Sequence, residues 1–430
     1  MNTNPHSPLF SEVGVIALVP DRWEPCWQAR HHIATRLARF FHVVWIDRPP
    51  TWQESLRWLV RRPKFSERSG VPENFSVHQA TAWTPNLGRP RNLGRRLSRR
   101  RLEKAHQTLR QQGCSRIILY LWQPVFADSL DLLDHDLSCY HIDDEYSFSP
   151  LEREPDPKEI QLIRKVDQVF IHSPAMMEKK GKLNPNTLLI PNGVDFQQYT
   201  MPTSEPDALK SIRKPRIGYA GNLKRMLDWH LLLELSHLHP EWSFVFVGRM
   251  LPHLEAQQML KQLENRENIH ILGARPTDQV PSYVQHFDVC MMPYKLDDYT
   301  KYIYPLKLHE YLASGKPIVG SPIPALQLFS DIVLVANGTQ EWSGKLARAL
   351  SAEENTLERC EARRKVAASH DWSFLVEKIA ATLAGRLGLA LPAVGKENMQ
   401  YAERLGSSND QDPTHSYGGF RSRQTLNLVP

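Results

Sequence analysis

The sequence predicts an α/β protein made of two doubly wound domains. Short apolar runs rich in β-branched residues alternate with amphipathic helical stretches, a polar segment interrupts this alternation at residues 191–215, and the alternation then begins again. The chain of 430 residues is also longer than a single hydrophobic core usually supports. Its 41% hydrophobic and 23% charged residues are ordinary for a globular protein.

The first half starts the alternation with an apolar run at residues 13–19 and a helical stretch at residues 28–41. Short continuous apolar runs separated by helices are typical of parallel strands that are covered on both faces. We expect no regular element at residues 51–82, where no period is visible. The strands expected in this half are 13–19, 42–47, 116–121, 138–142, 168–172 and 187–190.

The polar segment 191–215 is rich in Pro, Ser, Asp and Asn, which is typical of a linker between compact units. We therefore predict an N-terminal domain at residues 1–195 and a C-terminal domain at residues 196–390. Residues 394–430 are polar and aperiodic, so we expect a disordered tail there. The strands expected in the second half are 216–221, 244–248, 269–273, 288–293, 317–321 and 332–336, and its helices are expected from Trp229 and Thr277 and near 254–265, 305–314, 339–350, 353–369 and 373–387.

Composition and spacing exclude several classes of protein. No run of about 18 uncharged apolar residues is present, so we expect no membrane-spanning helix. The N-terminal residues lack the pattern of a secretion signal. The five cysteines are scattered and form no C-x-x-C pair, which indicates reduced thiols in the cytoplasm and not a disulfide framework.

Basic residues gather in one segment of the first half. Residues 89–101 hold seven arginines and no acidic residue, in a chain whose net charge is +6. Such a cluster can bind nucleic acid, a phosphorylated substrate or an anionic membrane, or it can be a solvated helix face. No nucleic-acid-binding motif accompanies it, so we expect no nucleic acid as partner. We favour an anionic membrane surface, which would make the protein peripheral to a membrane.

Ligands of open α/β sheets bind beyond the carboxyl ends of the strands, where loops meet helix N-termini. Two such domains in tandem place two of these edges face to face across a cleft, which suits an enzyme that joins two substrates. The most informative segment is 301–326. It predicts a helix from Pro305 to Ser314 that ends at Gly315 in the left-handed conformation and is followed by a buried strand.

Two charged residues of this expected helix form a candidate anion site. Lys307 lies in the first turn, where a cation opposes the helix dipole and is unfavourable unless a phosphate binds there. Glu310 lies three residues on, on the same face of the helix. The alternative is an ordinary surface ion pair, which stabilises a helix by only a few tenths of a kcal/mol.

The sequence HEYLASGKPIV at residues 309–319 resembles the donor-binding signature of GT-B glycosyltransferases, a large retaining group with two Rossmann-like domains. That signature has two glutamates separated by seven residues. Glu310 matches the second glutamate, which implies that it holds the ribose of the donor nucleotide, whereas Tyr302 stands where the first is expected. The local sequence is similar to the branch that includes teichuronic-acid-type and other exopolysaccharide transferases. In that branch Lys307 is implied to meet the pyrophosphate.

The start of the second half resembles the same family. The sequence PRIGYAGNL at residues 215–223 is similar to the first strand and glycine turn of the donor domain, where Gly221 lets the backbone approach the phosphates. Asn222 occupies the position where Arg is commoner. The resemblance therefore implies that Arg225 or Lys224 supplies the phosphate contact.

Two further stretches extend the resemblance to about residue 385. FVFVGR at residues 244–249 is similar to the second donor strand and ends at Gly248 and Arg249. Residues 268–294, which end at Tyr294, resemble the segment that cradles the base. We include all three residues in the expected donor site.

Acidic residues mark the first half. Asp143, Asp144 and Glu145 follow the expected strand 138–142. Clustered carboxylates at the carboxyl end of a strand can act as a base or as electrostatic stabilisers, or they can simply cap the following turn. We take Asp143 and Asp144 as the candidate catalytic pair. His31 and His32, which follow the first strand, either face the cleft or lie on a helix surface.

The resemblance implies transfer of a sugar from a nucleoside-diphosphate sugar to a lipid-linked or polysaccharide acceptor, with retention, in cell-surface polysaccharide biosynthesis. GT-B enzymes usually neutralise the departing phosphate with Lys, Arg and a helix N-terminus, so we expect no metal and no cofactor. One alternative is a nucleotide-sugar 2-epimerase, which shares the fold. A catalytically silent scaffold in a polysaccharide assembly complex is another, because Tyr302 replaces the first glutamate.

Overall fold

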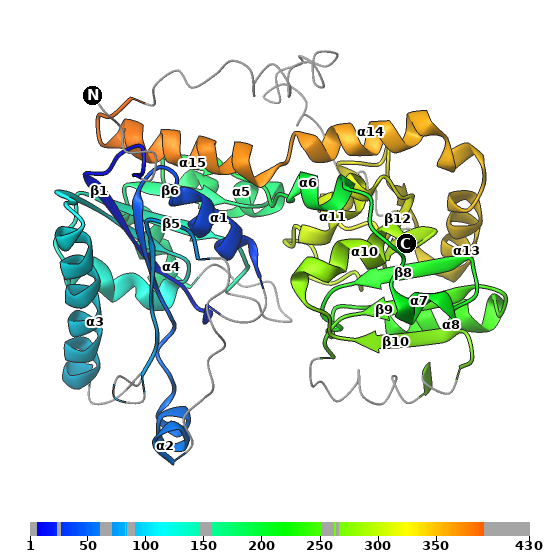
Figure 1. Ribbon diagram of the computed structural model, residues 1–430, viewed down its shortest axis with the longest axis horizontal. Coiled ribbons are helices and arrows are strands. Elements are labelled where there is room, and N and C mark those ends of the chain that lie inside the picture. Colours follow the sequence, from blue (N-terminus) through cyan, green and yellow to red (C-terminus); the bar gives the residue numbers. More distant parts are fainter. Residues whose placement is uncertain are drawn as a thin grey trace, which may run out of the picture. The chain divides into compact units, whose positions relative to one another are not determined.

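The computed structural model describes residues 7–23, 27–60, 71–81, 83, 91–146, 156–250, 262–263 and 266–390. Within these ranges the strands form two parallel sheets, one of seven strands and one of six (Figure 1). The predicted α/β class with two doubly wound sheets is therefore confirmed. Residues up to Pro392 form one compact unit. The tail predicted at 394–430 and the helix predicted at 254–265 lie outside the described residues, apart from residues 262 and 263.

The strand order makes both sheets doubly wound. The orders are β3-β2-β1-β4-β5-β6-β7 and β10-β9-β8-β11-β12-β13. In each sheet the chain moves outward over three strands, returns to the centre and moves outward the other way, so that β1/β4 and β8/β11 are the switch points where ligands bind in such folds. The strands are β1 (Val13–Leu18), β2 (His42–Ile46), β3 (Phe75–His78), β4 (Arg116–Leu121), β5 (Leu137–Ile142), β6 (Gln168–Ile171), β7 (Thr187–Leu189), β8 (Arg216–Ala220), β9 (Ser243–Val247), β10 (Ile269–Gly273), β11 (Val289–Met292), β12 (Ile318–Gly320) and β13 (Leu334–Val335).

The helices follow the predicted alternation closely in the second half. The predicted helix that ends at Gly315 is present as α11, and Gly315 has φ +77°. The α-helices are α1 (Ala29–Leu37), α2 (Trp52–Val60), α3 (Arg91–Gln111), α4 (Pro157–Lys165), α5 (Pro174–Lys180), α6 (Phe196–Thr200), α7 (Asp207–Lys210), α8 (Trp229–Leu238), α10 (Val280–Gln285), α11 (Leu306–Ser314), α12 (Pro324–Gln327), α13 (Gly338–Ala349), α14 (Leu357–Ala368) and α15 (Trp372–Arg386), and the short 3-10 helices are η1 (Pro124–Asp131), η2 (Gly181–Leu183), η3 (Thr277–Gln279) and η4 (Glu353–Asn355).

Alternate residues of β1 enter two separate cores, as expected for a sheet covered on both faces. Val13 and Val15 pack with residues of α1 and α15. Ile16 and Leu18 pack on the other face with residues of α3 and α4. β1 is therefore buried on both sides, which explains why its sequence is a continuous apolar run and not an alternating one.

The last helix does not pack where its position in the sequence places it. We predicted residues 196–390 as one domain, yet α15 contributes Trp372, Leu375 and Ile379 to the core of the first sheet (Figure 1). The Trp372 ring stacks on His32 of α1, with ring centroids 5.4 Å apart. The physical reason is that one face of α15 is apolar and is buried against α1. The boundary at residues 195/196 itself stays a prediction.

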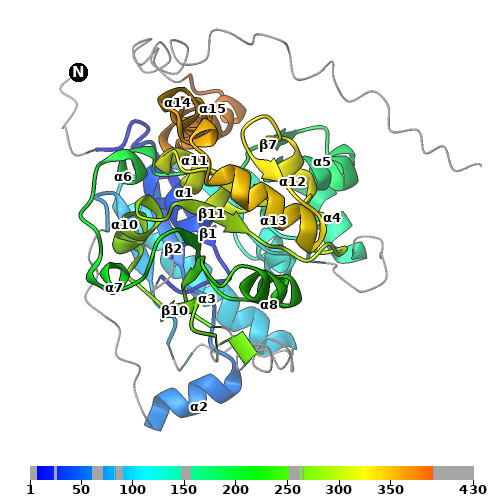
Figure 2. The same cartoon turned by 90° about the vertical axis from the view of Figure 1, so that its right-hand side faces the viewer.

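The prediction of no regular element at residues 51–82 is wrong. This stretch contains α2 and β3, and β3 pairs in parallel with β2. Figures 1 and 2 show α2 lying apart from the helices that cover the first sheet. The sequence does contain a signal for the start of α2, because Thr51 and Glu54 have the spacing of a capping box. In the structure the side chain of each residue accepts a hydrogen bond from the backbone amide of the other. The predicted linker 191–215 contains the short helices α6 and α7.

Candidate active site

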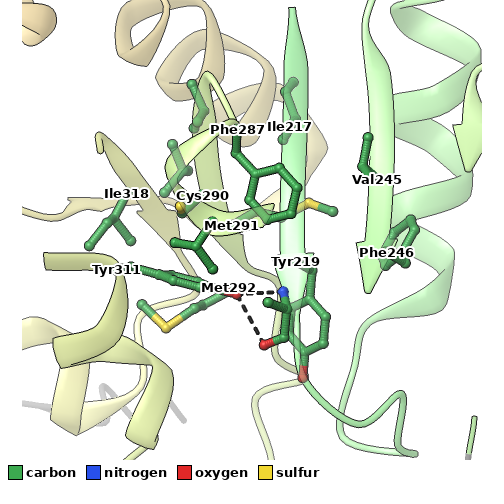
Figure 3. Packing of buried hydrophobic residues seen from close by; sticks show 14 of the residues in the cluster. Ile217, Tyr219, Val245, Phe246, Phe287, Cys290, Met291, Met292, Tyr311 and Ile318 are labelled. Carbon is green, nitrogen blue, oxygen red and sulfur yellow. Dashed lines mark hydrogen bonds between the residues drawn. The ribbon is translucent and has the colours of Figure 1, made fainter. Parts of the chain in front are cut away.

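The candidate donor site lies at the switch point of the second sheet. β8 ends at Ala220 and is followed by Gly221, and its neighbour β11 ends at Met292 shortly before Tyr294. Tyr311 of α11 ties this helix to the end of β8, because its hydroxyl accepts a hydrogen bond from the Ala220 amide at 2.7 Å (Figure 3). The first turn of α11 is thereby held against the carboxyl ends of the two strands.

Two glycines let backbone pack against backbone at this edge. Gly221 has φ +142°, which side chains rarely tolerate, and a Cβ there would lie 2.9 Å from Cε of Lys307. A Cβ on Gly248 would lie only 1.9 Å from the carbonyl oxygen of Gly221. The Gly221 amide also donates to the Val247 carbonyl at 2.8 Å. The two loops that follow β8 and β9 therefore require glycine at both positions.

Lys307 reaches across Gly221 into a group of tyrosines. Its Nζ donates to the Tyr294 hydroxyl at 3.2 Å and lies 4.9 Å from the centre of the Tyr219 ring. Burial lowers the pKa of Lys307, but the hydroxyls of Tyr219 and Tyr294, together with Glu310, more than offset this effect, so that the pKa lies above its ordinary value. Lys307 is therefore a partly buried cation at neutral pH.

Glu310 lies on the same helix face and is half-buried. Burial raises its pKa, while the charge of Lys307 and a hydrogen bond with Tyr199 of α6 act in the opposite direction. The electrostatic coupling between Lys307 and Glu310 agrees with the predicted same-face placement. It also shows that the two side chains are not an isolated surface pair, since both belong to a polar group among buried tyrosines.

The other predicted donor residues are arranged around this centre. The Asn222 carbonyl accepts a hydrogen bond from the Tyr219 hydroxyl at 3.2 Å, which holds the turn after β8. The Arg225 guanidinium lies 5.8 Å from the centre of the Tyr299 ring. Arg249 is exposed, and its carbonyl accepts from the Leu223 amide at 2.9 Å. Gly221, Gly248, Tyr294, Lys307 and Glu310 thus come together, whereas Arg225 and Arg249 lie at the rim.

Tyr302, at the position of the expected first glutamate, belongs to the protein core. Its side chain packs in the cluster of the first sheet that includes α3 and α4, and its carbonyl accepts from the Ser173 hydroxyl at 2.9 Å. Lys179 lies over its ring at 4.6 Å. Tyr302 therefore joins the loop before α11 to the first sheet.

The two candidate catalytic aspartates differ in their surroundings. Asp143 forms an ion pair with Nε of Arg30 at 2.6 Å, and its other oxygen accepts from the Tyr146 hydroxyl. Burial raises the pKa of Asp143, but Arg30 and Tyr146 outweigh it and the pKa is lowered. Both oxygens of Asp143 are therefore occupied by groups of the first half.

Asp144 has a pKa of about 6, raised by burial and by the neighbouring charge of Asp143. Its Oδ2 faces the Tyr299 hydroxyl at 3.5 Å, and the positive charge of Lys224 acts on it as well. Tyr299 and Lys224 both come from the second half of the chain. The carboxyl edges of the two sheets meet at this carboxylate.

Glu145 and the two histidines have structural surroundings. The Glu145 carboxylate is buried and binds Nζ of Lys180 at 2.9 Å. His31 is buried beside Trp45, and burial lowers its pKa to about 4. Burial likewise lowers the pKa of His32, which stacks on Trp372, to about 3. Both histidines are neutral at pH 7 and belong to the packing of α1.

Sequence reasoning missed Arg30, Tyr219 and Tyr299. Arg30 lies on α1, next to the histidines that we considered, but its pairing with Asp143 spans more than a hundred residues. Tyr219 lies within a strand, where a tyrosine is an ordinary core residue. No local pattern distinguishes these three, and only the fold places them at the site.

Within the described ranges, no three His, Cys, Asp or Glu side chains are grouped so that they could hold a metal ion. The same part of the chain contains no helix that is long and apolar enough to cross a membrane.

Comparison with known proteins identifies the enzyme class. Residues 214–352, which contain the whole candidate donor site, match the family model for glycosyl transferases group 1. This protein is a glycosyltransferase. The predicted enzyme class, a glycosyltransferase with the GT-B fold, is therefore confirmed.

Individual relatives agree with this assignment. A Bacillus subtilis (strain 168) protein named as a putative teichuronic acid biosynthesis glycosyltransferase, TuaH, is 26% identical over 276 residues, which cover 61% of this glycosyltransferase and 67% of TuaH. The α,α-trehalose 6-phosphate synthase of Burkholderia multivorans superposes with a TM-score of 0.61 at 13% identity, over 88% of this chain and 99% of that one. The E. coli trehalose-6-phosphate protein bound with UDP-2-fluoro glucose gives 0.62 at 13%, over 86% and 98%. These two structures share the GT-B fold of this glycosyltransferase.

Proposed function

We propose that this glycosyltransferase moves a sugar from a nucleoside-diphosphate donor, held at Lys307 and Glu310, to a lipid-linked or polysaccharide acceptor held near Asp144. The observation that carries the proposal is the Lys307 ammonium, placed between Gly221 and Tyr294 at the switch point. Such a site is where doubly wound folds bind nucleotides. The similarity to TuaH supports an acceptor in cell-surface polysaccharide biosynthesis.

Lys307 supplies the charge that the reaction needs. Departure of the nucleoside diphosphate leaves negative charge on the β-phosphate, and a fixed cation in a water-poor site stabilises it without reorganisation. Lys307 is already oriented by Tyr219 and Tyr294. Glu310 is suited to accept hydrogen bonds from the ribose hydroxyls. Asn222, Arg225, Gly248 and Arg249 border this donor site.

Asp144 is our candidate for the group that orients the acceptor hydroxyl and accepts its proton. Asp143 is held by Arg30, and its charge raises the pKa of Asp144 towards the range that suits a base near neutral pH. Asp143 is therefore proposed as an electrostatic partner of Asp144. The hydroxyl of Tyr299 closes the same position from the second half.

Replacement of the donor cation tests the proposal. Lys307→Met should weaken binding of the preferred nucleoside diphosphate by about 10- to 150-fold, because a charge-assisted contact contributes about 1.5–3 kcal/mol. Glu310→Gln should weaken binding in the same direction. Calorimetric titration with UDP and GDP measures the effect. UDP is the first probe, since a protein of the same fold is bound with a UDP sugar.

Lys210→Met is the matched control, because Lys210 is exposed on α7 and pairs only with the neighbouring Asp207 among the described contacts. Unchanged affinity in both site variants would contradict the placement of the donor.

Product analysis and the same titration then separate the proposed transferase from the two alternative functions. An isomerised free donor without transfer indicates a 2-epimerase, and no binding of either nucleotide indicates a silent scaffold.

The arginines of residues 89–101 support a location on the anionic, cytoplasmic face of a membrane, where lipid-linked acceptors are found. Arg95, Arg96, Arg99 and Arg100 are exposed on α3. Arg101 is not available to bind a membrane in the same way, because its guanidinium donates a hydrogen bond to the Asp47 carbonyl and burial lowers its pKa to about 10.

A further inference from the structure

The short helix α2 exposes an apolar stripe. Trp52, Leu56 and Leu59 follow one another at helical spacing and are 57%, 56% and 50% exposed. These are large side chains that a solvent-facing helix normally replaces with polar ones. The stripe therefore needs an explanation beyond the packing of α2 itself.

The opposite side of α2 is fixed to the first sheet. Ser55 is buried, and the Arg22 guanidinium lies 4.4 Å from the centre of the Trp58 ring. Glu54 binds Arg22 at 2.9 Å and Arg48 at 2.8 Å, which lowers the pKa of Glu54 to about 2. These contacts set which face of α2 turns outward, so the exposure of the apolar stripe is determined by the fold.

Basic residues lie at the same edge of the first sheet. α2 leaves the carboxyl end of β2, and the Arg101 guanidinium of α3 donates to the carbonyl of Asp47, the residue that follows β2. α3 ends at Gln111, shortly before the start of β4, so its first turns lie at this carboxyl edge. The exposed arginines 95, 96, 99 and 100 precede Arg101 on these turns, and the exposed Trp83 precedes α3.

We propose that α2 inserts its Trp52, Leu56 and Leu59 stripe into the interfacial layer of an anionic bilayer, while the four arginines of α3 bind the lipid headgroups. We call these seven residues the docking surface. A bilayer presents anionic groups and, a few ångströms deeper, an apolar layer, which matches this combination of Trp, Leu and Arg. Charge complementarity therefore selects an anionic membrane over a neutral apolar partner.

This docking would serve the proposed transfer to a lipid-linked acceptor, on which its biological role rests. Asp144 follows β5, and β5 is parallel to β2 in the same sheet, so both strands end at the same edge. A membrane bound at this edge lies on the side of the sheet where the candidate acceptor group is. The physical binding of α2 to lipid does not depend on the acceptor.

The test is flotation of the full-length protein with two kinds of vesicle. One contains phosphatidylcholine alone, and the other contains equal parts of phosphatidylcholine and phosphatidylglycerol. The wild type should float with the anionic vesicles and be released in part by salt. Leu56→Gln/Leu59→Gln should lower the partition coefficient by about 10-fold or more at every salt concentration, because the lost contribution is apolar. The variant with arginines 95, 96, 99 and 100 changed to Gln should lose more than about 100-fold at low salt.

Leu238→Gln/Leu357→Gln is the matched control, since both leucines are exposed on helices of the second half. It should bind vesicles as the wild type does. Equal flotation of the wild type and the α2 variant would overturn the proposal. So would a wild-type dimer that the α2 variant abolishes without any change in flotation, because a second copy would then cover the stripe.

The nucleotide titration keeps the two proposals apart. All these variants retain Lys307 and should bind UDP or GDP as the wild type does. Loss of nucleotide binding with normal flotation would count against the donor site alone. Normal nucleotide binding without flotation of the wild type would count against the docking surface alone.

Discussion

At the scale of single residues, neighbouring groups decide what each candidate side chain can do. Asp143 and Asp144 are adjacent in the sequence, yet burial and partners move their pKa values in opposite directions. Arg30 stabilises the charge of Asp143, and that charge in turn disfavours the ionised form of Asp144. Pairs whose environments push their pKa values apart can divide acid–base roles between them.

The raised pKa of Asp144 predicts the pH dependence of transfer. Below its pKa of about 6 the carboxyl is protonated and cannot accept a proton, so kcat/KM should fall as the pH decreases through 6. Asp144→Asn should be slower by about 100-fold or more at pH 8, and its profile should lack this limb. A pH series of kcat/KM for both proteins measures this.

Exposed Asp298, close to Tyr299 in the sequence, gives the control variant Asp298→Asn, which should keep the wild-type profile. Persistence of the same limb in Asp144→Asn would assign it to another group.

The raised pKa of Asp144 also affects the stability of the fold, and this effect changes with pH in the opposite direction to activity. Because the folded state raises this pKa from 3.8, ionisation of Asp144 destabilises the fold as the pH rises from 4 through 6.

At the scale of elements, the candidate donor site consists of two loops and one helix that approach closely. The loop after β8 carries Gly221, the loop after β9 carries Gly248, and α11 brings Lys307 across the first of them. The hydroxyl of Tyr311 fixes α11 to β8 (Figure 3). The position of the Lys307 ammonium is therefore set by backbone contacts that have no room for an added side chain.

Gly248→Ala should displace the loop after β8, because the new Cβ would lie 1.9 Å from the Gly221 carbonyl oxygen. We expect a loss of about 1–3 kcal/mol in the free energy of unfolding, the usual cost of overpacking, and weaker nucleotide binding. Urea unfolding and calorimetric titration measure the two effects.

Gly344→Ala on α13 is the matched control, since a Cβ there meets no atom within 4 Å. Alanine in a helix interior should leave stability unchanged or raise it by about 0.5–1 kcal/mol. If Gly248→Ala bound nucleotide and unfolded like Gly344→Ala, the close approach of the two loops would not matter for the site.

At the scale of the whole molecule, segments distant in sequence join the two sheets. α15 follows the second sheet in the chain but packs in the core of the first, and Tyr302 anchors the loop before α11 to the first sheet. Asn192 also donates to the Tyr304 carbonyl at 2.5 Å. The loop that leads into α11 is therefore held by both halves of the chain.

Residues 395–430 should be dispensable for this architecture. Their sequence is polar and aperiodic, and a chain that buries little apolar surface adds little to stability. A protein that ends at Val394 should unfold at the same urea midpoint and bind nucleotide with the same affinity as the full chain. Circular dichroism and calorimetry check this. Insoluble protein, or a midpoint shifted by that truncation, would assign these residues a structural role.

The sequence by itself determined the doubly wound class, the helix that ends at Ser314 before the left-handed Gly315, and the placement of Lys307 and Glu310 on one face of that helix. These features are local, since strand and helix periods, helix stops and i, i+3 spacing are carried by residues close together in the chain. The resemblance to the GT-B donor domain placed the glycine turns at Gly221 and Gly248.

Only the tertiary structure decided how the surroundings of Asp143 and Asp144 differ, where Tyr302 and α15 pack and which face of α2 is exposed. Each depends on partners brought from far away, as with Tyr299, which lies 155 residues beyond the Asp144 that it faces. Burial and electrostatic interactions act through space and fall off with distance in the fold, not along the chain. Residue order therefore carries no local record of them.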